Sequence, residues 1–224
     1  MELLFYRLIT ESDMRPITTR QAETIKDIRR IFALRYNYYI SSHELQVESN
    51  EDLREVMLQR DCLALQFGTY AGEDLIGCFR MEFGSTGDLS FAADWAFTDF
   101  VDEPLDMTAI VSGFCISPHL RDDRVIEHMV RESVGIAKDL RLPHIFFETS
   151  PDLWPMFHAE GLSRKGSALT DAETGLATAV YTLKTAPDRR WVAPSQAACE
   201  AHDITFIDVM PQTIRPRLKI VGGR

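Results

Sequence analysis

Apolar side chains follow a helical period in the first part of the chain. Between Gln21 and Ser42 they recur three or four residues apart, at Ile25, Ile28, Ile31, Phe32, Tyr36, Tyr39 and Ile40. This spacing predicts an amphipathic helix over 21–42, because residues three and four apart share one face of a helix. A polar stretch follows, and we expect a second, shorter helix over 50–59.

The pattern then changes to that of β-strands. Two strands are predicted at Cys62–Tyr70 and Leu75–Phe83, and the four residues between them, Ala71–Asp74, have the composition of a hairpin turn. The segment 84–108 is rich in aromatic and acidic residues, and we expect it to be partly loop.

The second half alternates strands and helices. We expect a strand at Ala109–Ile116, a helix at Asp123–Leu140, a strand at His144–Glu148, a short helix at Trp154–Glu160 and a strand at Ala177–Lys184. A strand–helix–strand unit is usually parallel and right-handed. The order therefore predicts a mixed α/β (α+β) fold with a central mixed sheet flanked by helices. Residues 187–194 have the composition of a linker, and a further strand is predicted at 204–209.

Composition narrows the class of protein. The chain has 224 residues, a formal net charge of −10 and 45% hydrophobic residues, which is typical of a globular protein with one substantial core. The acidic balance argues against nucleic acid as a partner. We expect a cytoplasmic protein, since there is no signal peptide pattern, no apolar run of membrane-spanning length and no disulfide framework among the four separated cysteines.

Arg35 interrupts the apolar face of the first predicted helix, on the line Ile28, Phe32, Arg35 and Tyr39. A guanidinium directed into a core needs an anionic partner. That partner is either a substrate carboxylate or acidic site residue, or a structural ion pair at the edge of the apolar face.

Arg80 and Glu82 share one face of the strand 75–83. Alternation places them with Ile76 and Cys78, opposite Leu75, Gly77, Phe79, Met81 and Phe83. This pair either lines a pocket, with Glu82 as a base, or forms the solvated face of an antiparallel strand.

A basic stripe lies on the predicted helix after residue 122. The residues that recur on it are Arg124, His128, Arg131 and Lys138, and Arg121 and Arg124 stand at the strand-to-helix junction, where a helix N-terminus favours anions. The stripe is either a solvated face or a docking surface for an acidic partner. We expect no metal site, because the six histidines form no ligand pattern and the cysteines have no zinc spacing.

These elements together resemble the GNAT acyltransferase superfamily, and in particular its branch of acyl-homoserine-lactone synthases and N-acyl amino acid synthases. The first helix resembles the leading helix of that branch, with Arg35 followed four residues later by the aromatic Tyr39. The strand Ile76–Met81 is similar to its Gly-x-x-Arg strand, which gives Arg80 a place in the pocket. The segments 109–140 and 154–162 resemble the acyl-donor motif and the short helix that follows it.

The resemblance implies a fold, an activity and a set of site residues. The fold is a GNAT-like domain over 1–186, with a C-terminal extension over 187–224. The activity is transfer of an acyl group from a thioester, on acyl carrier protein or coenzyme A, to the amine of an amino acid or similar small molecule, with no tightly bound cofactor. The implied residues are Glu82 and Glu148 as candidate bases, Arg35, Tyr39, Arg80 and Ser112 for the acceptor, and Phe114, Cys115, Ile116, Arg121, Arg124 and Ile126 for the donor. An acyl carrier protein is expected to dock on Arg124, Arg131 and Lys138, and the extension leaves a homodimer open.

Departures from the superfamily pattern keep two other functions open. The pyrophosphate loop corresponds to Arg121–Ile126, with Arg124 and Ile126 in place of its two glycines, and Phe157 stands where many acetyltransferases have a tyrosine acid. In the branch's Glu-x-Ser-Arg segment both charged members are absent, since Ile110 and Gly113 replace them. The alternatives are an acetyl-coenzyme A-dependent N-acetyltransferase and a non-catalytic GNAT-like protein that binds a ligand or partner.

Overall fold

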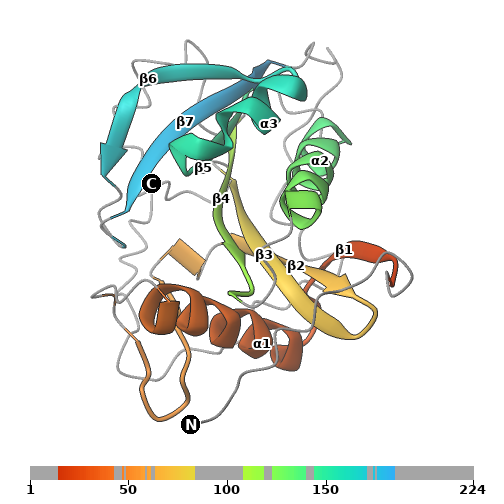
Figure 1. Ribbon diagram of the computed structural model, residues 1–224, viewed down its shortest axis with the longest axis vertical. Helices are drawn as coiled ribbons and strands as arrows, with labels where there is room; N and C mark the ends of the chain where they lie inside the picture. Colours follow the sequence, from red (N-terminus) through yellow and green to blue (C-terminus); the bar gives the residue numbers. More distant parts are fainter. Residues whose placement is uncertain are drawn as a thin grey trace, which may run out of the picture.

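In the part of the chain that the structure describes, seven strands form one mixed sheet, in the order β1-β2-β3-β4-β5-β7-β6 (Figure 1). The computed structural model describes residues 15–42, 47, 49–58, 60–61, 64–83, 108–118, 123–139, 144–170, 174 and 176–184. The strands are β1 (Ile17–Gln21), β2 (Ala64–Ala71), β3 (Asp74–Phe83), β4 (Thr108–Ile116), β5 (His144–Thr149), β6 (Ser163–Thr170) and β7 (Ala177–Lys184). Neighbouring strands are antiparallel except for β4 and β5, which are parallel at the centre of the sheet.

Helix α1 (Ile25–Tyr36) lies within the first predicted helix but is shorter than expected. Thr24 caps its N-terminus, since the Thr24 side chain accepts a hydrogen bond from the backbone N–H of Asp27. Gln21 belongs instead to β1, where it pairs with Phe67. After Tyr36 the chain continues as a π-helical segment, Asn37–Ser42, which is a geometry often found at functional sites.

Helices α1 and α2 (Asp123–Asp139) cover opposite faces of the sheet. The apolar side of α1 packs with Cys78, whereas α2 packs with the cluster that contains Phe79. Because successive side chains of a strand point to opposite faces, these two contacts lie on the two sides of β3. The short helix α3 (Trp154–Ala159) joins the α2 side through Phe157. The predicted mixed α/β fold is confirmed.

One predicted helix is absent and two strands were not predicted. No helix forms over the described residues of 50–59: Asn50 and Glu55 form an isolated β-bridge around a turn, and the Asn50 side chain accepts a hydrogen bond from the Leu53 N–H. Such local side-chain bonds compete with helix formation. Strands β1 and β6 were not predicted, because each is polar on its exposed side and lacks a run of apolar residues.

The face predicted for β3 is right from Gly77 onward and wrong before it. An extra residue in the β2–β3 pairing, opposite Thr69 and Tyr70, interrupts the alternation. Ile76 therefore packs with Phe79 on the α2 side, and Leu75 packs with the cluster on the α1 side. The predicted strand at 204–209 and the extension 187–224 lie outside the described residues.

Candidate functional site

The two parallel strands part at the centre of the sheet. Strands β4 and β5 pair from Thr108–His144 to Val111–Phe147. Beyond that point β4 stays paired with β3 and β5 stays paired with β7. Ser112 on β4 and Glu148 on β5 are the first residues past the last pair, so the space between the strands opens at these two side chains.

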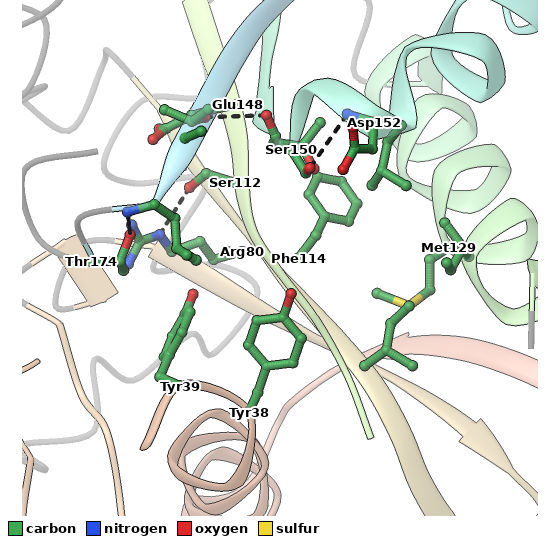
Figure 2. A pocket seen from close by; sticks show the side chains of 18 of the residues that line it. Tyr38, Tyr39, Arg80, Ser112, Phe114, Met129, Glu148, Ser150, Asp152 and Thr174 are labelled. Atoms are coloured by element: carbon green, nitrogen blue, oxygen red, sulfur yellow. Dashed lines mark hydrogen bonds between the residues drawn. The ribbon is translucent and has the colours of Figure 1, made fainter. Parts of the chain in front are cut away.

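A cavity of about 290 Å³ lies at this opening. Figure 2 shows Tyr38 and Tyr39 directed into it from one side, with Arg80, Ser112 and Glu148 on another. The apolar part of its wall consists of Leu58, Phe114, Ile116, Ile126, Met129, Leu153, Leu176 and Ala177, and the other polar residues along it are Thr149, Ser150, Asp152, Thr174 and Thr178. The cavity therefore combines an apolar wall with a cluster of polar side chains where β4 and β5 part.

A bulge in β4 shapes one wall of the cavity. Strand β3 pairs Cys78 with Cys115 but Arg80 with Ser112, so Gly113 and Phe114 together face a single residue of β3. Gly113 has φ +67, in the left-handed region that favours glycine. A Cβ atom on Gly113 would lie 3.3 Å from an Nη atom of Arg35.

Replacing Gly113 with alanine is expected to lower the free energy of unfolding by about 1–3 kcal/mol, because a side chain in the left-handed region is strained. Chemical denaturation measures the change. Gly135 provides the control, since nothing lies within 4 Å of a Cβ atom built there, and Gly135→Ala in helix α2 is expected not to destabilise the protein. Equal effects of Gly113→Ala and Gly135→Ala would show that the left-handed conformation at the β4 bulge does not require glycine.

Asp61 lies at the centre of a group of buried polar side chains. Its Oδ1 atom accepts hydrogen bonds from Arg35 at 2.6 Å, from Arg80 at 3.1 Å and from the amide of Gln66 at 3.1 Å. Its Oδ2 atom accepts the backbone N–H of Leu58 at 2.7 Å. Burial alone raises the pKa of Asp61, but the two guanidiniums and this N–H outweigh burial and lower the pKa to about 2.

Arg60 lies at the centre of a second, adjoining group of buried side chains. Its guanidinium contacts Glu82 at 3.0 Å and Glu148 at 2.8 Å, and it lies 3.5 Å from the hydroxyl of Ser112. Arg80 joins the two groups, because its Nε donates to the Ser112 hydroxyl at 2.9 Å and its Nη1 donates to Asp61. We call the six ionisable residues the charge cluster; they are Arg35, Arg60, Arg80, Asp61, Glu82 and Glu148. Three positive and three negative groups bring its formal charge to zero.

Tyr38 and Tyr39 extend from the π-helical segment to the cavity (Figure 2). Burial raises the pKa of Tyr38 to about 12 and that of Tyr39 well above its ordinary value. Both hydroxyls therefore stay protonated at neutral pH and can act as hydrogen-bond donors. Phe157 is fully buried, between Phe114, Phe147 and Tyr181, and it does not line the cavity.

The structure brings most of the predicted site residues to one place. Those that line the cavity are Tyr39, Arg80, Ser112, Glu148, Phe114, Ile116 and Ile126. Arg35 and Glu82 lie behind the wall, inside the charge cluster. The Cys115 thiol is buried beside Cys78 on the α1 side of the sheet, Arg124 is exposed on α2, and Arg121 lies outside the described residues. Their roles remain predictions.

Sequence reasoning missed Arg60, Asp61 and Tyr38. Adjacent residues of opposite charge, such as Arg60 and Asp61, are usually a solvated pair, and these two lay between the helix predicted over 50–59 and the strand predicted from Cys62. Tyr38 was passed over because it is not on the apolar line of the predicted helix. The π-helical turn alters the angle between neighbouring side chains and brings both tyrosines to one cavity.

The basic stripe lies on the same helix as part of the cavity wall. Ile126 and Met129 of α2 line the cavity. Arg124 and Lys138 are exposed, and the Arg131 side chain is 67% exposed and 3.8 Å from Glu160. His128 is half-buried, and burial lowers its pKa. Within the described part of the chain there is no cluster of three or more His, Cys, Asp or Glu that could hold a metal ion, and no helix there has the length and apolar character of a membrane span.

Comparison with solved structures relates this fold to acyltransferases. The acyl-homoserine-lactone synthase LasI superimposes with a TM-score of 0.58 at 14% identity, over 76% of this chain and 90% of its own. The coenzyme A-dependent acyl-homoserine-lactone synthase BjaI gives 0.58 at 17% identity, over 84% and 87%. FeeM, an N-acyl amino acid synthase from uncultured soil microbes, gives 0.52 at 14% identity, over 76% and 92%.

This protein has a GNAT-like fold. The resemblance expected from the helix with Arg35 and the strand with Arg80 is thereby confirmed at the level of the fold. No model of a protein family matches the sequence, and no curated protein matches it. At the low identities of the matched structures, the GNAT-like similarity concerns the path of the chain, and the chemistry has to be argued from the residues of the cavity.

Proposed function

We propose that this protein is an N-acyltransferase that transfers an acyl group from a thioester to the amine of a small molecule. The observation that carries the proposal is the position of Glu148. Its side chain is a buried carboxylate at the point where β4 and β5 part, and it faces a cavity that combines polar side chains with an apolar wall. A carboxylate in such a place can take a proton from an amine while the apolar wall holds an acyl chain.

The reaction needs three contributions from the chain. The amine nitrogen attacks the thioester carbonyl carbon, the C–N bond forms, and Glu148 accepts a proton of the amine directly or through water. A backbone N–H of β4 at the Gly113–Phe114 bulge stabilises the oxyanion. The C–S bond then breaks, and the proton held by Glu148 passes to the leaving sulfur, directly or through water, so that a thiol is released and the carboxylate is restored. Tyr38 and Tyr39 supply neutral hydroxyl donors in the same cavity.

The acceptor is proposed to lie at the polar end of the cavity. Arg80 and Ser112 line this end beside Glu148, and Tyr39 closes it from the side of α1. Arg35 is fully buried and bonds Asp61 and Gln66, so it orders Arg80 through Asp61 rather than contacting the acceptor. An amino acid or similar small amine fits this end.

The donor is proposed to lie along the apolar wall. Phe114 and Ile116 of β4 face Ile126 and Met129 of α2 across the cavity, which suits an acyl chain and the pantetheine arm. The BjaI structure contains isopentyl-coenzyme A. For the present chain, either coenzyme A or a carrier protein presents the thioester.

A panel of donors and acceptors tests this function. The protein is incubated with acyl-coenzyme A or acyl carrier protein thioesters and with amino acids or other amines, and thiol release and amide formation are followed by mass spectrometry. The expected result is amide formed in proportion to thiol released. If no donor is consumed or bound, the proposal is overturned and a non-catalytic ligand-binding protein remains. Preference for acetyl-coenzyme A over longer chains would identify an N-acetyltransferase.

Charge reversal on α2 separates the two kinds of donor. Arg131→Glu with Lys138→Glu is expected to raise KM for an acyl carrier protein thioester roughly tenfold, because carrier proteins are acidic and the protein's net charge of −10 offers little other attraction. Kinetics with acyl-coenzyme A are expected to change less than twofold. Equal changes for both donors would contradict a docking role for the stripe.

A further inference from the structure

Arg60 enters the charge cluster from outside the sheet. It belongs to the short segment before β2, and only 7% of its surface is exposed. Its Nη2 atom lies 3.0 Å from an oxygen of Glu82 and 2.8 Å from an oxygen of Glu148. One guanidinium thus contacts two carboxylates that belong to different strands.

Without Arg60, the negative charges of Glu82 and Glu148 would lie close together inside the protein. Glu82 is on β3 and Glu148 is on β5, on either side of β4, and both side chains are buried. The Ser112 hydroxyl of β4 lies between them and donates to Glu82 at 3.2 Å. Buried carboxylates that lie close together repel each other unless cations lie between them; Arg60 contacts both of these carboxylates, and the Nε atom of Arg80 lies 3.4 Å from Glu82.

We propose that Arg60 is a positioning residue of the acyl transfer: its guanidinium bridges Glu82 and Glu148 and keeps Glu148 ionised and directed to the cavity as the proton acceptor. The inference rests on the proposed function. Glu148 lines the cavity, whereas Arg60 and Glu82 lie behind the wall, so Arg60 acts on the reaction through Glu148.

The surroundings of Glu148 give Arg60 this role. In the sheet Glu148 pairs with apolar Val180 of β7, and like Ser112 of β4 it directly follows the last pair of β4 and β5. Arg80 lies next in the cluster, 3.1 Å from Asp61 and 3.4 Å from Glu82, and Asp152 follows β5 at the rim of the cavity. Arg60 donates directly to Glu148, from Nη2 to a carboxylate oxygen at 2.8 Å.

Arg60 retains its charge in this position. Burial and the neighbouring Arg80 lower the pKa of Arg60, but Glu148 and Glu82 outweigh them, so the pKa is raised overall. Arg60 therefore stays a cation near neutral pH, 2.8 Å from the Glu148 carboxylate.

The test measures the titration of Glu148 with and without Arg60. In protein labelled with ¹³C at the glutamate carboxyl carbons, the Glu148 resonance is assigned with Glu148→Gln and followed against pH by NMR. Arg60→Met is expected to move this titration to higher pH by about 1–2 units. The acid limb of the kcat profile should move with it, while KM for the donor stays within about twofold.

Three further variants make the result specific. Arg29→Met is the matched control, because Arg29 also bonds a glutamate at 2.8 Å but is 47% exposed on α1, and it should leave the Glu148 titration in place. Arg60→Lys retains a charge but not the two-sided fork, and should give a smaller shift than Arg60→Met. The double change Arg60→Met with Glu82→Gln also removes the neighbouring carboxylate. The Glu148 titration should then move part of the way back to its wild-type pH, and the protein should fold even if the single variant does not.

The outcomes separate Arg60 from the function as a whole. An unchanged Glu148 titration in Arg60→Lys and in every folded Arg60→Met variant overturns the proposal, even if the enzyme is active. A shifted NMR titration in a protein that acylates no amine supports the bridge and overturns the proposed function. A loss of thermal stability with an unchanged pH profile would show that Arg60 is structural only, and overturns its positioning role.

Discussion

Replacing Asp61 with alanine is expected to destabilise the protein by about 3–5 kcal/mol, which is the range found when a buried charge loses its partner. The change would leave the guanidiniums of Arg35 and Arg80 inside the core without the carboxylate that both of them bond. Arg35 has no exposed surface, so water cannot replace the lost partner without local unfolding. The free energy of unfolding in urea measures the effect.

The same carboxylate predicts a pH dependence of stability. The pKa of Asp61 is lowered from 3.8 to about 2 in the folded protein, so Asp61 binds a proton more readily when the chain is unfolded. Its contribution, on the order of 2 kcal/mol, is therefore fully present above about pH 4 and is lost as the pH falls toward 2.

Asp61→Asn isolates this charge, because the amide has nearly the shape of the carboxylate but cannot ionise. The difference in unfolding free energy between the wild type and Asp61→Asn should be largest above pH 4 and should shrink as the pH is lowered. A difference that stays constant between pH 5 and pH 2 would show that the charge of Asp61 does not stabilise the fold.

Replacing Glu148 with glutamine is expected to reduce kcat by a factor of about 100–10,000, the usual contribution of a positioned general base. Glutamine keeps the size of the side chain and part of its hydrogen bonding to Arg60, but it cannot accept the proton of the amine. Steady-state kinetics with a saturating thioester measure kcat, and equilibrium binding of the donor checks that the cavity is intact.

Glu82→Gln is the informative comparison, because Glu82 is the other candidate base and shares Arg60 with Glu148. Glu82 does not line the cavity, so its loss should lower kcat by much less than the loss of Glu148. Equal losses of kcat would mean that the two carboxylates act as one unit. A fully active Glu148→Gln would show that water or another residue is the base.

Local sequence patterns predicted the elements that have a strong period of their own. The apolar residues of α1 repeat over three turns, and the helix was expected in the right place, although its ends were not. The strand carrying Arg80 and Glu82 was also expected, with both residues on one face. Short polar strands such as β1 have no comparable signal, because the sheet that pairs with them decides their conformation.

The amino-acid sequence by itself determined that an arginine would lie on the buried side of α1, that Arg80 and Glu82 would be neighbours, and that the fold would resemble GNAT acyltransferases. The tertiary structure decided what these charges bond. Arg35 meets Asp61 across 26 residues and Arg60 meets Glu148 across 88. Periodicity reports the face on which a side chain lies, since it depends on neighbours a few residues away. The partner of a buried charge depends on how distant segments pack, and that information is absent from any local pattern.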